Sequence, residues 1–292
     1  MSRVDPTALD WGVVRSATAR VRQHYRYVYS AAVHDLKQRL MMIPPDRYHD
    51  QVLESWSLDV RGIDGACRIS WENDGWGNRI CHVEGARVEH AVDFEAVFCV
   101  ERRQQICAHV SNHAADRAFL EFTALTAPND AVRAAARDIR AATASPLEQA
   151  ELAHDWSARS IAYEVGVTGT RTPAAMALHL GRGVCQDFAH IMLSLLRTLG
   201  LPGRYISGHL LGEGAPHAWV EVTLPSGAVA YDPTHHRRAR LDYLTVAVGR
   251  DFADVTMTSG VFTGAATGRL HWSKQAELIQ VRPSEAEKGA AA

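Results

Sequence analysis

Three residues in the second half of the chain are of the types that nucleophilic catalysis uses. Cys185 opens an apolar run, His217 precedes the alternating segment 218–224, and Asp232 ends a second alternating segment. A thiolate is a strong nucleophile, an imidazole can hold and return a proton, and a carboxylate can orient the imidazole. The residue types predict a catalytic triad in which Cys185 is the nucleophile, His217 the general base and acid, and Asp232 the orienting group.

The setting of Cys185 favours the thiolate form. Glycines at 181 and 183 precede it, and apolar residues three or four apart then predict a helix that ends at Gly200-Leu201-Pro202. Unpaired amide groups at a helix start stabilise an anion by up to about 2 kcal/mol. The Cys185 amide is also the expected donor to a tetrahedral oxyanion, with His179 and Gln186 as weak second candidates. Asp187 is expected to complement the helix N-terminus.

A hairpin is expected to bring the other two residues together. Pro225-Ser226-Gly227 suits a turn between the alternating segments 218–224 and 228–232. Antiparallel pairing then places His217 and Asp232 at the same end of the hairpin. Asp232 is expected to accept the Nδ1 proton of His217 and to fix its orientation.

Each residue taken alone has a structural explanation. A lone helical cysteine is usually a small buried side chain, and an aspartate before proline is usually a turn former. The joint occurrence of the three favours catalysis. His190 is expected to be structural, and His235-His236 beside two arginines is expected to lie in a solvated loop. No Cys/His spacing matches zinc and no glycine-rich phosphate loop is present, so neither a metal nor a cofactor is predicted.

The elements that must position these residues divide the chain in two. The first 115 residues alternate in polarity and are rich in aromatic and β-branched residues, which predicts an antiparallel β domain at 1–115. Helices are expected at 131–142 and from 146 to about 165, the second capped by Ser145. With the later strands they form a core at 116–283, before a disordered tail at 284–292. The predicted fold class is α+β.

Composition limits the possible functions. The chain has 292 residues, is 47% hydrophobic and carries a net charge of −2, without a basic stripe for nucleic acid. Charged residues interrupt the first 30 residues, and no stretch reaches the roughly 18 apolar residues of a membrane span. These features predict a cytoplasmic protein that binds neither nucleic acid nor membrane. Five irregularly spaced cysteines favour free thiols, and the sequence does not indicate an oligomeric state.

The segments around the three residues resemble the transglutaminase-like superfamily of papain-like folds. The resemblance rests on four motifs: Gly183-Val184-Cys185-Gln186-Asp187-Phe188-Ala189, Gly200-Leu201-Pro202-Gly203-Arg204-Tyr205 with His209, His217-Ala218-Trp219-Val220-Glu221-Val222, and Asp232-Pro233-Thr234. It implies a papain-like core and the Cys185, His217 and Asp232 triad. Segments 25–30, 74–78 and 248–255 resemble the N-terminal β domain and the tail of bacterial transglutaminase-like proteins. Met257-Thr258 departs from the pattern, where a Pro-containing turn is expected.

The resemblance also implies the chemistry. Members attack a carboxamide or peptide carbonyl with a thiolate and pass through a thioester, which water or an amine then resolves. No amine site is recognisable, so hydrolysis of an amide or peptide bond is the primary hypothesis, with transamidation as the alternative. A non-catalytic binding module built on a triad scaffold is the alternative from another class. Nothing resembles the calcium sites of the animal cross-linking enzymes.

Overall fold

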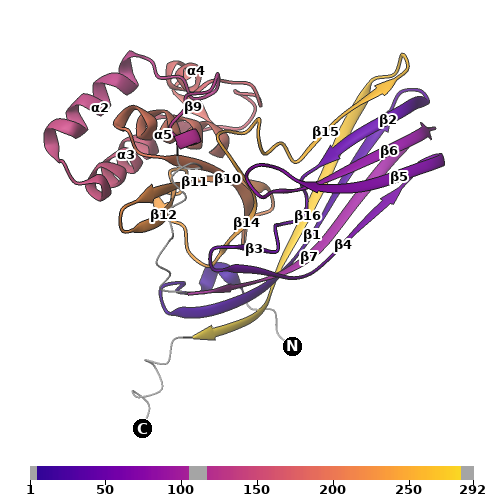
Figure 1. Cartoon of the computed structure of the whole chain (residues 1–292), viewed down its shortest axis with the longest axis horizontal. Helices are drawn as coiled ribbons and strands as arrows, with labels where there is room; N and C mark the ends of the chain where they lie inside the picture. Colours follow the sequence, from indigo (N-terminus) through magenta and orange to yellow (C-terminus); the bar gives the residue numbers. More distant parts are fainter. Residues whose placement is uncertain (1–4, 105–116, 284–292) are drawn as a thin grey trace, which may run out of the picture.

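The computed structural model describes residues 5–104 and 117–283 (Figure 1). The N-terminal strands are β1 (Val14–Tyr29), β2 (Val33–Leu40), β3 (Arg47–Tyr48), β4 (Gln51–Arg61), β5 (Asp64–Asn73), β6 (Arg79–Val88) and β7 (Ala91–Arg103), after a 3₁₀ turn η1 (Pro6–Ala8). The helices are α2 (Asp130–Ala142), α3 (Pro146–Ser160), α4 (Ala174–Leu180) and α5 (Cys185–Leu199). The later strands are β8 (Ala162–Tyr163), β9 (Arg182–Gly183), β10 (Gly203–Leu210), β11 (Pro216–Leu224), β12 (Gly227–Asp232), β13 (Arg237–Arg238), β14 (Tyr243–Gly249), β15 (Thr258–Thr263) and β16 (Gly268–Pro283). The α+β class predicted from the sequence is confirmed.

Two antiparallel sheets form a sandwich from the N-terminal strands. One has the order β16-β1-β7-β4-β3 and the other β15-β2-β6-β5. Along β1 buried and exposed residues alternate, because successive side chains of a strand point to opposite faces. Val21 and Phe94 of the first sheet share one hydrophobic cluster with Leu36 and Val83 of the second. The two sheets therefore face one another across a common core.

The C-terminal strands belong to this sandwich, which corrects their expected place in the core. β16 pairs with β1 from Val14↔Pro283 to Tyr29↔Gly268, and β15 pairs with β2. Figure 1 shows the yellow β15 and β16 lying along the indigo strands. Apolar residues of β16 such as Leu278 pack on the sandwich core. The two ends of the described chain thus build one unit, and the central part is inserted between them. The expected disordered tail at 284–292 lies outside the described residues.

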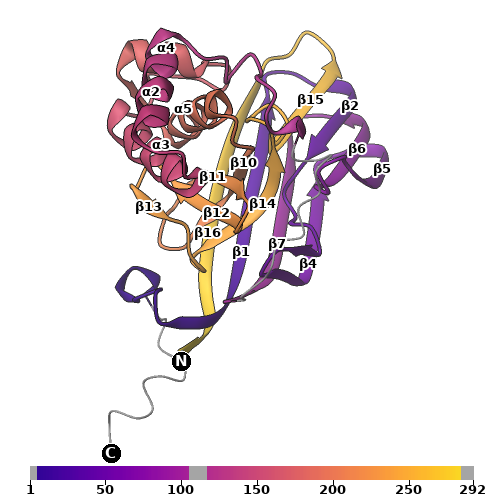
Figure 2. The same cartoon turned by 60° about the vertical axis from the view of Figure 1, so that its left-hand side comes forward.

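The central sheet has the order β13-β12-β11-β10-β14, and helices cover one of its faces (Figure 2). Leu193 and Leu196 of α5 pack with Val220 and Val222 of β11. α5 is buried on nearly every side because α2, α3 and α4 pack around it. Leu244 of β14 joins the core of the sandwich, so the opposite side of the sheet meets the N-terminal strands.

Two buried amide side chains join the sandwich to the edge of the central sheet. Asn78 donates to the Val248 carbonyl and accepts from the Val248 N–H, at 2.7 Å in both cases. Gln51 makes the same pair of bonds to Thr245, at 2.7 and 2.9 Å. The amides satisfy backbone groups that an edge strand otherwise leaves unpaired. β14 is therefore held in register by side chains rather than by another strand.

Most expected helix limits agree with the structure. Asn129 caps α2 by accepting from the Val132 N–H at 3.0 Å, and Ser145 caps α3 by accepting from the Glu148 N–H at 3.4 Å. α3 ends five residues before the predicted position 165, because the chain becomes extended at Ile161 and enters β8. The short helix α4 was not predicted from the sequence. No helix among residues 5–104 and 117–283 is long and apolar enough to cross a membrane.

Candidate active site

Cys185 is the first residue of α5 and is partly exposed. The helix begins there because Val184 is extended and its N–H donates to Asp187 Oδ2 at 2.8 Å. The hydroxyl of Thr168 donates to the same oxygen at 2.6 Å. A Cβ on Gly183 would lie 2.6 Å from Asp187 Oδ2, so only glycine leaves room for this cap. The expected role of Asp187 at the helix N-terminus is confirmed.

His217 and Asp232 meet at one end of the predicted hairpin. β11 and β12 pair from Leu224↔Gly227 to Val220↔Tyr231, which places His217 near the start of one strand and Asp232 at the end of the other. His217 Nε2 lies 2.7 Å from Asp232 Oδ2, and both side chains are buried. The nitrogen is not the Nδ1 that we predicted. The ring meets Asp232 through Nε2, the nitrogen farther from its own Cβ, so Nδ1 lies on the side away from that carboxylate.

Asp232 accepts more hydrogen bonds than a simple triad would require. His217, His235 Nδ1 at 2.7 Å and the Tyr243 hydroxyl at 2.6 Å all donate to Oδ2. Oδ1 accepts the backbone N–H groups of Thr234 at 2.9 Å and His235 at 3.2 Å. Burial opposes ionisation, yet these donors, His217 first, hold the pKa of Asp232 far below its ordinary range. Asp232 is therefore a fixed negative charge at neutral pH.

His217 interacts with both of the other predicted site residues. Burial alone would lower its pKa, but hydrogen bonds to Asp232 and Cys185 and their charges raise the pKa to about 10. Because Nε2 is used by Asp232, Nδ1 is the ring nitrogen left for the thiol. The influence of both groups on one imidazole is what the predicted order of thiol, imidazole and carboxylate requires. At neutral pH the imidazole is in its charged form.

His235 and Glu213 form a second charged pair beside His217. His235 Nε2 lies 2.7 Å from Glu213 Oε1, and Glu213 Oε2 lies 3.7 Å from His217 Nδ1. Hydrogen bonds to Asp232 and Glu213 raise the pKa of His235 to about 9. The expected loop position of His235 is confirmed, since the residue is exposed in the turn after Asp232. Its contacts with two carboxylates were not predicted, because the direction of the side chain depends on that turn.

A lysine of β16, a strand of the sandwich, contacts the loop beside this site. Lys274 Nζ donates to the carbonyl of Leu210 at 3.4 Å and to that of Ala215 at 3.0 Å, on either side of Glu213. Burial lowers the pKa of Lys274 to about 8. The C-terminal strand thus fixes the loop between β10 and β11 that presents Glu213 to His217.

Tyr163 faces the site from β8. This strand pairs in parallel with β9, with Tyr163 opposite Gly183, two residues before Cys185. The side chain is 57% exposed. Partial burial and the charges of Cys185 and Glu213 raise the pKa of Tyr163, so its hydroxyl stays protonated at neutral pH. Tyr163 was missed from the sequence because we expected the preceding helix to continue through it.

The remaining residues named from the sequence lie around this centre. Trp219 is buried and stacks on His217 with ring centroids 6.2 Å apart, as expected of a shielding residue. His190 Nε2 accepts from the Phe252 N–H at 3.2 Å, and burial lowers the pKa of His190 to about 3. Its predicted structural role is confirmed. Gln186 donates its amide to the Thr170 carbonyl at 3.1 Å, and His179 is exposed at the end of α4.

The raised pKa of His217 predicts how folding stability depends on pH. An unfolded histidine titrates near pH 6.5, whereas His217 keeps its proton to about pH 10. Between these values the folded state binds more protons, so the free energy of unfolding should fall as pH rises. The stabilisation is complete below pH 6.5 and lost near pH 10. Urea unfolding of wild type and His217→Asn should therefore differ more near pH 6.5 than near pH 9.

His235 contributes with the same sign and needs its own control. Its pKa of about 9 predicts a smaller loss over the same range, because the side chain is partly exposed. His34→Asn, an exposed histidine in β2, should leave the pH dependence unchanged. Parallel curves for wild type and His217→Asn would show that His217 is not charged in the folded state.

Two sequence families match the chain in separate regions. The transglutaminase-like superfamily matches residues 133–233, which hold Cys185, His217 and Asp232. The bacterial transglutaminase-like N-terminal region matches residues 19–101, which span most of the sandwich. The two matches together cover more than half of the chain.

Two mycobacterial proteins are similar to part of this chain. An uncharacterised protein of Mycobacterium leprae is 39% identical over 155 residues, which cover 50% of this chain and 55% of that protein. One of Mycobacterium bovis is 34% identical over 115 residues, 34% of this chain and 37% of that protein. The chain therefore matches about half or less of the length of these relatives.

The crystal structure of a protein proposed to be a cysteine protease, from Cytophaga hutchinsonii, superposes with a TM-score of 0.72. The match covers 94% of this chain and 95% of that one at 19% sequence identity, so it shows the fold. The similarity extends over sandwich and core together. The chain thus combines a core of the transglutaminase-like superfamily at residues 133–233 with a bacterial transglutaminase-like N-terminal region at residues 19–101.

Proposed function

We propose that the chain is a cysteine-dependent acyl-transfer enzyme that hydrolyses amide or peptide bonds through a thioester on Cys185. The observation that carries the proposal is the buried His217, bonded to Asp232 through Nε2 and to Cys185 at the start of α5. An imidazolium between a carboxylate and a thiol is the arrangement that supplies both a thiolate nucleophile and a proton for the leaving group.

The acylation half of the reaction starts from a Cys185 thiolate and a His217 imidazolium. The Cys185 thiolate attacks the carbonyl carbon of the substrate, forming a carbon–sulfur bond while the carbonyl electron pair moves to oxygen. The carbon–nitrogen bond then breaks, and His217 gives its Nδ1 proton to the departing amine. The products are a thioester on Cys185, a free amine or ammonia, and a neutral imidazole.

The deacylation half restores the starting state. Neutral His217 removes a proton from water, whose oxygen attacks the thioester carbonyl. Collapse of the tetrahedral intermediate breaks the carbon–sulfur bond and releases the carboxylic acid and the thiolate. His217 is again an imidazolium held by Asp232, so no charge accumulates over the cycle.

We propose two groups as hydrogen-bond donors to the oxyanion. The amide of Cys185 opens α5, where N–H groups lack an acceptor within the helix. We propose the hydroxyl of Tyr163 as the second donor, because β8 pairs with β9 and sets Tyr163 opposite Gly183, two residues before Cys185. The exposure of Tyr163 leaves the donor accessible to a bound peptide or protein amide.

The acceptor that resolves the thioester distinguishes the hypotheses. Purified protein would be incubated with glutaminyl peptides, with and without a labelled primary amine, and products and enzyme would be weighed by mass spectrometry. Hydrolysis predicts a shortened or deamidated peptide and an acyl adduct on Cys185. Label in the peptide would mean transamidation instead. Absence of any adduct or product across a diverse peptide set, with a folded protein, would favour a binding module.

A further inference from the structure

The adjacent histidines after Asp232 point into different clusters. His235 joins His217 and Asp232, whereas the Nε2 of His236 lies 2.6 Å from Oδ1 of Asp155 in α3. His236 has a φ of 51°, a left-handed conformation that is uncommon outside glycine. The turn therefore directs the second histidine toward the helix, where it meets residues that the proposed mechanism does not use.

Three potential metal ligands converge at this point. His154, Asp155 and His236 each offer a ligand atom within 4.8 Å of the others. The rings of His154 and His236 lie 5.2 Å apart between centroids. His236 and Asp155 are at the surface, so small side-chain rotations can bring their atoms to the roughly 2.0–2.2 Å that zinc requires.

The buried ligand is already oriented by its other nitrogen. His154 Nε2 lies 3.1 Å from the backbone carbonyl of Asp232, which fixes the ring and leaves Nδ1 for an ion. Ligating histidines usually donate their second N–H to a carbonyl or carboxylate in this way. The same bond connects the cluster to the residue that holds His217.

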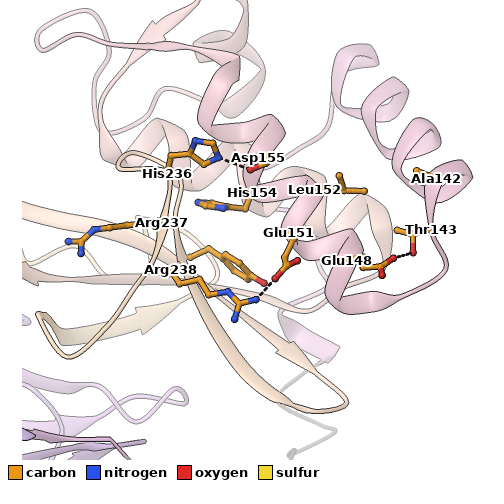
Figure 3. A pocket seen from close by; sticks show the side chains of 11 residues that line it. Ala142, Thr143, Glu148, Glu151, Leu152, His154, Asp155, His236, Arg237 and Arg238 are labelled. Atoms are coloured by element: carbon orange, nitrogen blue, oxygen red, sulfur yellow. Dashed lines mark hydrogen bonds and ion pairs between the residues drawn. The ribbon is translucent and has the colours of Figure 1, made fainter. Parts of the chain in front are cut away.

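A pocket beside the cluster leaves room for water or a further ligand (Figure 3). It has a volume of about 580 Å³, and Figure 3 shows His236 and Asp155 turned toward one another above His154. The two nearby guanidinium groups are engaged elsewhere. Arg238 is paired with Glu151, and Arg237 lies 2.8 Å from Asp242. Each charge is therefore offset by a carboxylate, which lessens its repulsion of a cation at the cluster.

We propose that His154, Asp155 and His236 bind a zinc-class divalent cation, with water completing the coordination. Two imidazoles and one carboxylate with an open fourth position are a donor set typical of Zn²⁺ in proteins. The ion would cross-link α3 to the turn after β12, next to Asp232. The site is separate from Cys185 and does not depend on the proposed reaction.

The test is a titration of the metal-free protein with Co²⁺, measured by the visible absorption of the bound Co²⁺. Zn²⁺ is then added to displace the Co²⁺. Saturation near one equivalent is expected. His236→Ala and Asp155→Asn should each weaken binding more than about tenfold, because each loses one of the three protein ligands. His34→Ala, an exposed histidine in the sandwich, should bind as wild type.

Two further variants separate this site from the neighbouring cluster of His217, Asp232 and His235, whose ligand atoms are also close. Cys185→Ser removes the thiol and His235→Ala removes one of those histidines, and both should retain Co²⁺ binding. Loss of binding in His235→Ala with retention in His236→Ala would overturn the proposal. So would failure of the wild-type protein to bind either metal while circular dichroism shows that it is folded.

Discussion

Cys185→Ser is expected to lower the rate of amide hydrolysis by on the order of 10³-fold or more, because a serine hydroxyl is not ionised by this imidazole. Cys185 opens α5, and it is one of the two residues that raise the pKa of His217. The measurement is the rate on the best substrate from the glutaminyl peptide screen. The variant should fold normally, since the side chain is partly exposed and nearly isosteric.

The matched control is Cys67→Ser, which changes an exposed thiol in the sandwich. It should have the wild-type rate. An active Cys185→Ser would show that Cys185 is not the nucleophile, and an inactive Cys67→Ser would show that the loss is not specific to Cys185.

Asp232→Asn is expected to lower the same rate by roughly 10²–10⁴-fold. An asparagine has no charge to hold the imidazolium of His217, and its amide must place a donor against groups that already donate. Side-chain donors from His217, His235 and Tyr243 converge on Oδ2, and two backbone N–H groups donate to Oδ1, so either amide orientation sets an NH2 group against donors. Thermal unfolding should also occur at a lower temperature, because buried donors lose their acceptor.

Tyr243→Phe is the comparison for this variant. It removes one donor to Asp232 but keeps the charge, and its effect on rate should be much smaller. Equal losses in the two variants, both folded, would mean that packing around Asp232 matters and its charge does not.

Features set by short stretches of sequence were predictable. The hairpin of β11 and β12 follows from alternation and a turn, and it brings His217 to Asp232. The caps of α2 and α3 and the start of α5 follow from side chains within a few residues. These local features were sufficient to nominate the residues of the site.

Features set by distant pairing were not predictable. Pairing of β16 with β1 joins opposite ends of the chain, and the residues of either strand do not indicate which strand it pairs with. β8 replaces the end of a predicted helix because it pairs with β9, and α4 separates these two strands in the sequence. The nitrogen of His217 that meets Asp232, and the opposite directions of His235 and His236, depend on backbone angles that residue types do not specify. The predicted domain limits near 115 fall outside the described residues, and the cytoplasmic location stays a prediction.

The most direct test of the site is the rate at which iodoacetamide alkylates each cysteine at neutral pH, read by peptide mass spectrometry. Cys67 is more exposed than Cys185, so accessibility alone predicts that Cys67 reacts first. The thiolate held by His217 predicts instead that Cys185 reacts roughly tenfold faster or more, and that His217→Ala abolishes the difference. Equal slow labelling of Cys185 and Cys67 in the wild-type protein would contradict the activated thiolate and, with it, the proposed enzyme.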